Sequence, residues 1–145
     1  MSPRISKKTS NKRKIDLEID PQATKILRNV SDAEAFYFYE KVGKPTGKSA
    51  KNLMDFLNTV NMIKLESLQF HLERKDFQKW FKETLGDHRL AERMEKLPLA
   101  DNEELRTRIK EVLEYRLREL QDSYITLEVK GEQPETIYQR EQLIG

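Results

Sequence analysis

The chain has 145 residues, of which 36% are charged and 37% hydrophobic, so we expect one modest core and therefore one domain with tails. It contains no cysteine, which excludes disulfides and thiolate metal sites and favours a reducing, cytoplasmic location. No apolar run approaches the roughly 18 residues that a membrane-spanning helix needs, so we expect no membrane partner.

Residues 1–14 are strongly basic. They contain no acid and six cations, which are Arg4, Lys7, Lys8, Lys12, Arg13 and Lys14. Because these six belong to a total of 27 Lys and Arg residues, the rest of the chain has 21 bases against 25 acids, a net charge of −4. Such a polar segment lacks the apolar residues to fold alone, so we expect a disordered basic arm on a mildly acidic body.

Residues 15–34 are expected to form a short strand and a short helix. Apolar and acidic residues alternate over 15–19, which predicts a strand. Pro21 ends this strand and favours a helix over residues 22–29.

Residues 31–42 fit two structures equally well. Ser31 or Asp32 can cap a helix that ends near Val42. The run FYFY at 36–39 also fits a strand, with the phenylalanines on one face and the tyrosines exposed on the other. Both alternatives stay open at this point.

Residues 43–47 are expected to form a loop, since they contain two glycines and a proline. Ser49 is then the expected N-cap of a helix over residues 50–60, and another helix begins near Leu65.

The next predicted helix begins at Asp76 as its N-cap. Its large apolar side chains have helical spacing and are Phe77, Trp80, Phe81 and Leu85. Gly86 is expected to end this helix in the left-handed conformation, and Asp87 to cap a helix that ends at Leu97.

The longest helix is predicted over residues 102–122, capped by Asp101 or Asn102. Residues 124–129 alternate between apolar and polar side chains, which predicts a second strand. The expected fold is therefore mainly α, a single multi-helix domain with short flanking strands that can pair as a two-stranded ribbon.

The expected organisation has four parts. These are a disordered basic arm (1–14), a strand plus a short helix (15–34), a helical core domain (35–122), and a C-terminal strand and tail (123–145). The expected core residues are apolar and come from the helices and the FYFY run: Phe36, Phe38, Leu53, Phe56, Leu57, Leu68, Leu72, Phe77, Trp80, Phe81, Leu85, Leu90, Leu105, Ile109, Val112, Leu113 and Leu117.

Two groups of residues resemble known sequences. The first group is His71, Asp76, Phe77, Trp80, Leu85, Gly86, Asp87, Leu90 and Ala91, which resembles a small helical module of archaeal and bacterial proteins. The second is Phe36, Tyr37, Phe38, Tyr39, Gly43, Lys44, Thr46, Gly47, Ser49, Ala50, Leu53 and Phe56. Together they resemble a mostly archaeal family of unknown function over about residues 35–121. This resemblance implies no particular chemistry.

The sequence GKPTGKS, from Gly43 to Ser49, differs from a phosphate-binding loop. That loop needs four residues between its glycines so that successive amides surround a phosphate. Here three residues separate Gly43 from Gly47, and one of them, Pro45, has no amide hydrogen. A capped loop is the simpler interpretation.

Catalytic and metal sites have no supporting pattern. The two histidines, His71 and His88, have neither cysteines nor a histidine–glutamate motif beside them, so they form a poor ligand set. We expect His71 to pack or to form structural hydrogen bonds. The sequence therefore predicts no metal, no cofactor and no enzymatic activity.

The basic arm is the most informative functional feature, because its cations can neutralise phosphates without reading bases. Lys44, Lys48 and Lys51 are further candidates for contact with a nucleic-acid backbone. The leading hypothesis is a non-catalytic RNA- or ribosome-binding factor that regulates translation. The alternatives are a protein–protein adaptor with an incidental solubility tail and, more remotely, an enzyme acting on phosphorylated ligands.

The two predicted strands also suggest a homodimer. A strand at 15–19 and a strand at 124–129 would leave unpaired amides and a small apolar face in water. Ribbons from two chains could cover each other and present two basic arms at once. The other outcome is a ribbon that folds back on its own body.

Overall fold

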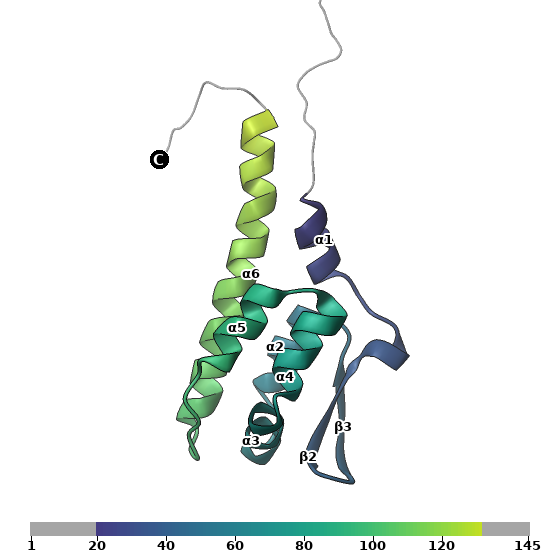
Figure 1. The fold of residues 1–145 in the computed structure, drawn as a ribbon, viewed down its shortest axis with the longest axis vertical. Helices are drawn as coiled ribbons and strands as arrows, with labels where there is room; N and C mark the ends of the chain where they lie inside the picture. The colour runs from purple at the N-terminus through teal and green to yellow at the C-terminus, as the bar shows by residue number, and fades with distance from the viewer. Residues whose placement is uncertain (1–19, 132–145) are drawn as a thin grey trace, which may run out of the picture. The chain divides into compact units, whose positions relative to one another are not determined.

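The computed structural model describes residues 20–131, with side chains described from 20 to 123. In this part of the chain, six α-helices and one two-stranded antiparallel sheet are present, which confirms the mainly α fold class (Figure 1). The basic arm and the strand expected at 15–19 lie outside the described residues. The contacts divide the chain into a larger unit, residues 25–119, and a smaller one, whose described part is residues 20–24 and 120–131.

A β-hairpin begins the larger unit. Strand β2 (Phe36–Lys41) pairs with strand β3 (Lys44–Ala50), and Gly43, at φ 77°, lies in the tight turn between them. The strand alternative for the FYFY run is therefore confirmed, and the loop expected at 43–47 is wrong. The pairing tolerates Pro45 because the register shifts beside Tyr39, its partner.

Three helical segments follow the hairpin, with bounds that partly differ from expectation. Helix α2 (Leu53–Val60) has Asn52 as its N-cap, whose side chain accepts a hydrogen bond from the Asp55 N–H at 2.7 Å. Ser49 and Ala50 are not its cap and first turn, because β3 extends through Ala50. Helix α3 (Leu65–Arg74) begins where predicted, and α4 (Asp76–Lys79) follows after Lys75 in the left-handed conformation.

Asp76 is the first residue of α4 and not its N-cap, which corrects the sequence-based expectation. The chain continues as a π-helical segment, η2 (Trp80–Leu85), to Gly86 at φ 82°, as expected for this glycine. Asp87 then caps α5 (His88–Glu95), accepting from the Leu90 N–H at 3.1 Å. Gly86 and Asp87 therefore have the helix-ending and capping roles predicted for them, whereas Asp76 does not have its predicted capping role.

The last helix, α6 (Glu104–Gly131), begins in the larger unit and continues into the smaller one. The Asn102 side chain accepts from the Glu104 N–H at 2.9 Å, as expected of a cap. Residues 124–129 are helical, so the strand predicted there is wrong. Extending an existing helix gains one hydrogen bond per residue fixed, and here that gain outweighs a local strand preference.

The homodimer hypothesis depended on strands at both ends of the chain. One of these, at 124–129, is helical, and the other lies outside the described residues. The argument from paired edge strands therefore no longer applies.

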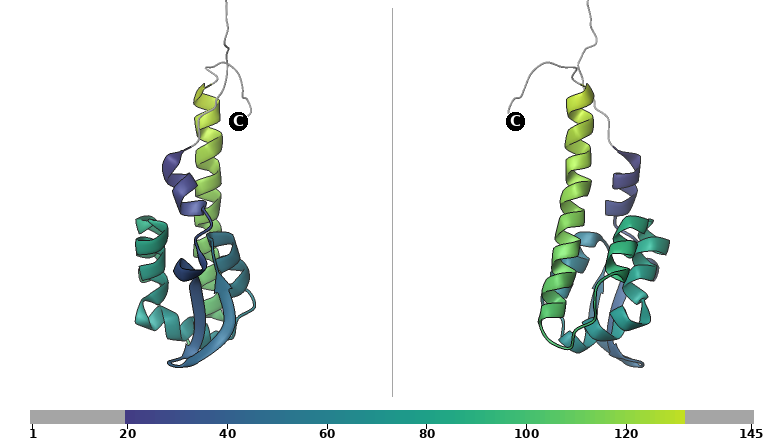
Figure 2. Two further views of the ribbon diagram at one scale, coloured as in Figure 1. Left: turned by 90° about the vertical axis from the view of Figure 1, so that its right-hand side faces the viewer. Right: turned by 60° about the vertical axis from the view of Figure 1, so that its left-hand side comes forward.

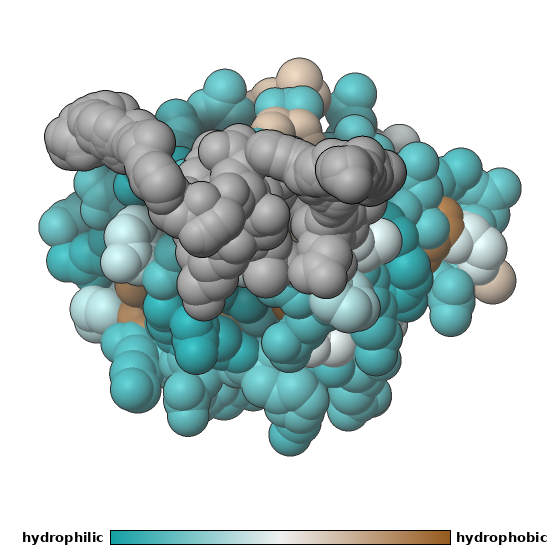
Figure 3. Space-filling view, turned by 90° about the horizontal axis from the view of Figure 1, so that it is seen from above, coloured by the Kyte–Doolittle hydropathy of each residue, from teal (hydrophilic) through white to brown (hydrophobic). Residues whose placement is uncertain are grey.

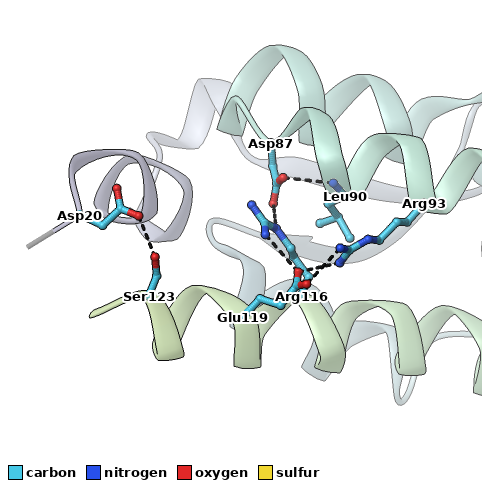
Figure 4. A network of polar contacts seen from close by, with 7 residues as sticks. All are labelled: Asp20, Asp87, Leu90, Arg93, Arg116, Glu119 and Ser123. Carbon is cyan, nitrogen blue, oxygen red and sulfur yellow. Dashed lines mark hydrogen bonds and ion pairs between the residues drawn. The ribbon is translucent and has the colours of Figure 1, made fainter. Parts of the chain in front are cut away.

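The smaller unit contains the start of α1 (Pro21–Leu27), a helix that agrees with the one expected after Pro21. The Asp20 carboxylate accepts from the Gln22 N–H at 3.0 Å and from the Ser123 hydroxyl at 2.8 Å, so it ties two distant parts of the sequence together (Figure 4).

In the larger unit, α3 packs against β2 and α2 against β3 (Figure 1, Figure 2). Aromatic rings fill the space between hairpin and helices. The Phe36 and Phe38 ring centroids are 4.8 Å apart, and Phe56 stacks on Trp80 at 5.5 Å. The expected core residues are buried except Leu57 and Val112, which are half-buried.

A buried charge network connects α5 to α6 within the larger unit (Figure 4). The Arg116 Nε donates to Asp87 at 2.9 Å, and the exposed fractions of these side chains are 10% and 1%. Glu119 accepts from Arg116 at 3.1 Å and from both terminal nitrogens of Arg93, at 2.7 and 3.0 Å. Each buried charge therefore has an opposite partner, which compensates for its lost hydration.

Candidate functional site

A groove of about 470 Å³ runs beside β2 in the larger unit. Residues from the hairpin, from α3 and from the α4–η2 segment line it. A π-helical turn such as η2 is uncommon and often occurs at functional sites, and here Trp80, Glu83 and Thr84 from η2 contribute to the lining.

The hairpin side of the groove has exposed aromatic surface. Because the phenylalanines of the FYFY run face the core, Tyr37 points outward and is 48% exposed, while Tyr39 is half-buried. The Tyr37 hydroxyl donates to the Asp32 carbonyl oxygen at 2.5 Å. This bond fixes the position of the ring, so the groove has a rigid aromatic face on this side.

His71 joins β2 to the helices at the base of the groove. Its ring is buried, and its Nε2 accepts from the Tyr39 N–H at 2.8 Å. The proton of the neutral ring must therefore be on Nδ1, which donates to the Asp76 carboxylate at 2.8 Å. Burial lowers the pKa of His71, and the neighbouring Asp76 opposes this only in part.

This geometry makes His71 a structural residue, in agreement with the interpretation from sequence. Both ring nitrogens already have partners, so neither is free to accept a proton from a substrate. The same contacts explain why Asp76 does not cap α4, since its carboxylate binds His71 and, at 3.0 Å, the Arg74 Nε.

Two cations line the helical side of the groove. The Arg74 guanidinium lies 4.9 Å from the centroid of the half-buried Phe70 ring, a cation–π contact. Lys79 is exposed and has no carboxylate within ion-pair distance among the described residues. Glu83 lies on the same lining and is the acid that partly offsets these charges.

The lysines predicted from sequence are not gathered in this groove. Lys44 forms an ion pair with Glu40 at 3.1 Å, and Lys51 forms one with Asp32 at 2.6 Å. The Asp32 hydrogen bond raises the pKa of Lys51, and the same contact lowers the pKa of Asp32. Lys48 is exposed on β3 without an ion pair to any described residue.

The other predicted binding residues, those of the arm at 1–14, lie outside the described part of the chain.

On the face drawn in Figure 3 the described residues are mainly hydrophilic. Among the residues described, no group of three or more histidines or acids is arranged to hold a metal ion.

Sequence reasoning found part of the groove and missed the rest. Alternation in the FYFY run predicted the exposure of Tyr37 and Tyr39. Phe70, Arg74 and Lys79 were not singled out as functional residues. Phe70 and Arg74 are four residues apart on α3, a spacing that brings helical side chains together and could have revealed the pair.

None of the helices that the structure describes is both long enough and apolar enough to cross a bilayer.

Neither a curated protein nor a solved structure matches the chain. Residues 73–135 match the model of a family of unknown function, DUF5752.

This match begins later than the expected resemblance at about residues 35–121 and extends further. It includes Arg74 and Lys79 but not Tyr37, Tyr39 or Phe70. The chain is therefore similar over residues 73–135 to a family of unknown function, and that similarity covers part of the helical side of the groove and none of the hairpin.

Proposed function

We propose that the protein is a non-catalytic RNA-binding factor in the cytoplasm, whose RNA is free or part of the ribosome and whose binding regulates translation. The observation that supports this proposal most is the segregation of charge. The stretch 1–14 has six cations and no acid. In the body, by contrast, many cations have carboxylate partners close by.

The compensated charges of the body explain why the arm would supply most of the affinity. A cation that already has a carboxylate partner gains less from a phosphate, because it must first give up that partner. Lys44 and Lys51 are in this situation, with Glu40 and Asp32. The arm has no acid in its own stretch, so its cations are the better candidates for releasing counterions from RNA.

The non-catalytic part of the proposal rests on His71. It is the buried histidine of the groove, and both of its ring nitrogens form hydrogen bonds within the protein. An adaptor that binds another protein is the alternative, and it predicts binding that depends little on salt.

Deletion of residues 1–14 tests the proposal. If all six cations contact phosphates of a single strand, the slope of log K against log salt falls by about four units, from roughly 0.7 per contact. The measurement is fluorescence anisotropy with a labelled single-stranded RNA at several salt concentrations. Thermal unfolding should be unchanged.

The matched control is the double variant Lys44→Gln, Lys51→Gln. It also removes cations, but ones with carboxylate partners, so we expect a much smaller change in slope. An unchanged slope in the truncated protein would show that the arm is only a solubility tail.

A further inference from the structure

We infer that the groove beside β2 binds unpaired bases of a single-stranded RNA, with Tyr37 as the stacking surface and Arg74 and Lys79 beside the phosphates. This inference rests on the proposed RNA-binding function and assigns a site to it. The groove volume of about 470 Å³ lies within the range of roughly 300–1,000 Å³ that is typical of small-molecule pockets.

The aromatic side of the groove suits a nucleobase. Proteins bind single-stranded nucleic acids by stacking bases on aromatic rings, and the stacking tolerates any sequence because every base has a π-face. Tyr37 presents an exposed ring that its hydroxyl bond to Asp32 already holds in place. A preorganised ring loses little side-chain entropy when a base stacks on it.

The cationic side supplies charge complementarity. In the part of the chain with described side chains, the Arg74 terminal nitrogens have no hydrogen-bond partner, since its bond to Asp76 uses Nε. Lys79 likewise has no carboxylate partner there. Both are therefore available to phosphate oxygens, whereas the nearby Asp76 is already engaged by His71.

The hairpin geometry disfavours the other common occupant, an extended peptide. A peptide that adds to a sheet edge needs free backbone amides along that edge. The Tyr39 N–H, on the groove side of β2, already donates to His71. Strand addition would have to break this bond, whereas base stacking on Tyr37 leaves it intact.

The experiment compares Tyr37→Ala with Tyr115→Ala. Tyr115 is a matched control because it is 52% exposed and does not line the groove. Binding is measured with a labelled 12-nucleotide oligouridine and with a blunt duplex RNA of equal length. Loss of one stacked base corresponds to about 5- to 150-fold weaker binding. We expect this loss for Tyr37→Ala with oligouridine and no loss with the duplex or for Tyr115→Ala.

Lys79→Gln provides a second variant on an exposed position, where misfolding is not a concern. It should reduce the salt slope for oligouridine by about 0.7, the value for one phosphate contact on a single strand. If Tyr37→Ala and Lys79→Gln both bind oligouridine with the wild-type affinity and the wild-type salt slope, the groove assignment is wrong. The arm-dependent function would remain intact. Capture of a peptide by the groove, with oligouridine binding unaffected by Tyr37→Ala, would overturn it as well.

The proposed function fails in a different way. If the full chain binds neither oligouridine nor duplex RNA at low salt, then RNA binding itself is wrong. If the full chain binds both and only deletion of residues 1–14 weakens that binding, the function stands and the groove has another role.

Discussion

Two of the regions in which the larger unit buries polar side chains differ in how much of their surroundings they leave exposed. Between α5 and α6, Asp87 and Arg116 form an ion pair whose members are 1% and 10% exposed. Beside β2, the buried His71 is neutral and lies next to a groove in which Tyr37 is 48% exposed.

This contrast separates a packing contact from the wall of the proposed binding groove. In the Asp87–Arg116 network each charged group has an opposite partner within the protein, and the Asp87 and Arg116 side chains are almost fully buried. His71 also has both ring nitrogens engaged, but its hydrogen bonds hold an aromatic strand beside two available cations. We therefore expect variants of the first region to affect stability alone, and variants of the second to affect stability and binding.

The largest effect is expected from Arg116→Met. This change leaves the Asp87 carboxylate buried without its cation, and breaking a buried pair in this way costs about 3–5 kcal/mol. The measurement is the free energy of unfolding from urea titration.

Arg108→Met is the control for that variant, because it lies on the same helix in a more exposed ion pair with Glu104. Its expected cost is about 0.5 kcal/mol. Equal stability of Arg116→Met and the wild type would mean that the buried network does not hold α5 to α6.

A smaller effect is expected from His71→Leu. The substitution removes the acceptor of the Tyr39 N–H and the donor to Asp76, and an unsatisfied buried group costs about 1–3 kcal/mol. Urea titration again gives the free energy, and oligouridine binding reports on the groove. His88→Ala, at an exposed histidine, is the matched control. A His71→Leu protein with unchanged stability and binding would show that the His71 contacts do not shape the groove.

The smallest effect is a dependence of stability on pH. Burial lowers the pKa of His71 in the folded protein, so the unfolded chain takes up a proton first as the pH falls. The contribution of His71 to stability should therefore be constant above about pH 7 and should decline as the pH falls through the unfolded pKa, ~6.5, towards the lower pKa of the folded state.

The pH dependence of stability that comes from His71 can be separated from the pH dependence that comes from the carboxylates. The pKa values of Asp32, Glu40, Glu103 and Glu119 are lowered by their basic partners, so they contribute to stability above the acidic pKa range of about 4. Urea titrations between pH 5 and 8 therefore exclude most of the carboxylate effect, and comparison with His71→Leu isolates the part that His71 contributes. If His71→Leu shows the same slope as the wild type in this range, His71 is not its source.

Local patterns predicted the helices well, because helix formation depends on nearby residues. The spacing of Phe77, Trp80, Phe81 and Leu85 placed these side chains correctly in the core. The hairpin was harder to predict because Pro45 and two glycines obscure the alternation of β3. Residues 124–129 were missed for the opposite reason, since their alternation is real but the preceding helix continues through it.

The candidate site was only partly predictable because it depends on distant contacts. The exposure of Tyr37 follows from alternation within one strand. The Tyr39–His71 hydrogen bond joins residues 32 positions apart, which no local pattern shows. The same holds for the meeting of Phe70, Arg74 and Lys79 with the hairpin. Asp76 was given a capping role because its partner His71 could not be identified from sequence.

Photo-crosslinking tests the central claim most directly. Oligouridine that contains 4-thiouridine would be irradiated with the full chain, and the attachment sites would be located by mass spectrometry. The account predicts crosslinks at Tyr37 or Phe70 and within residues 1–14, with competition by unlabelled single-stranded RNA and not by duplex RNA. Crosslinks confined to residues outside the groove and the arm, or no specific crosslinks at all, would contradict it.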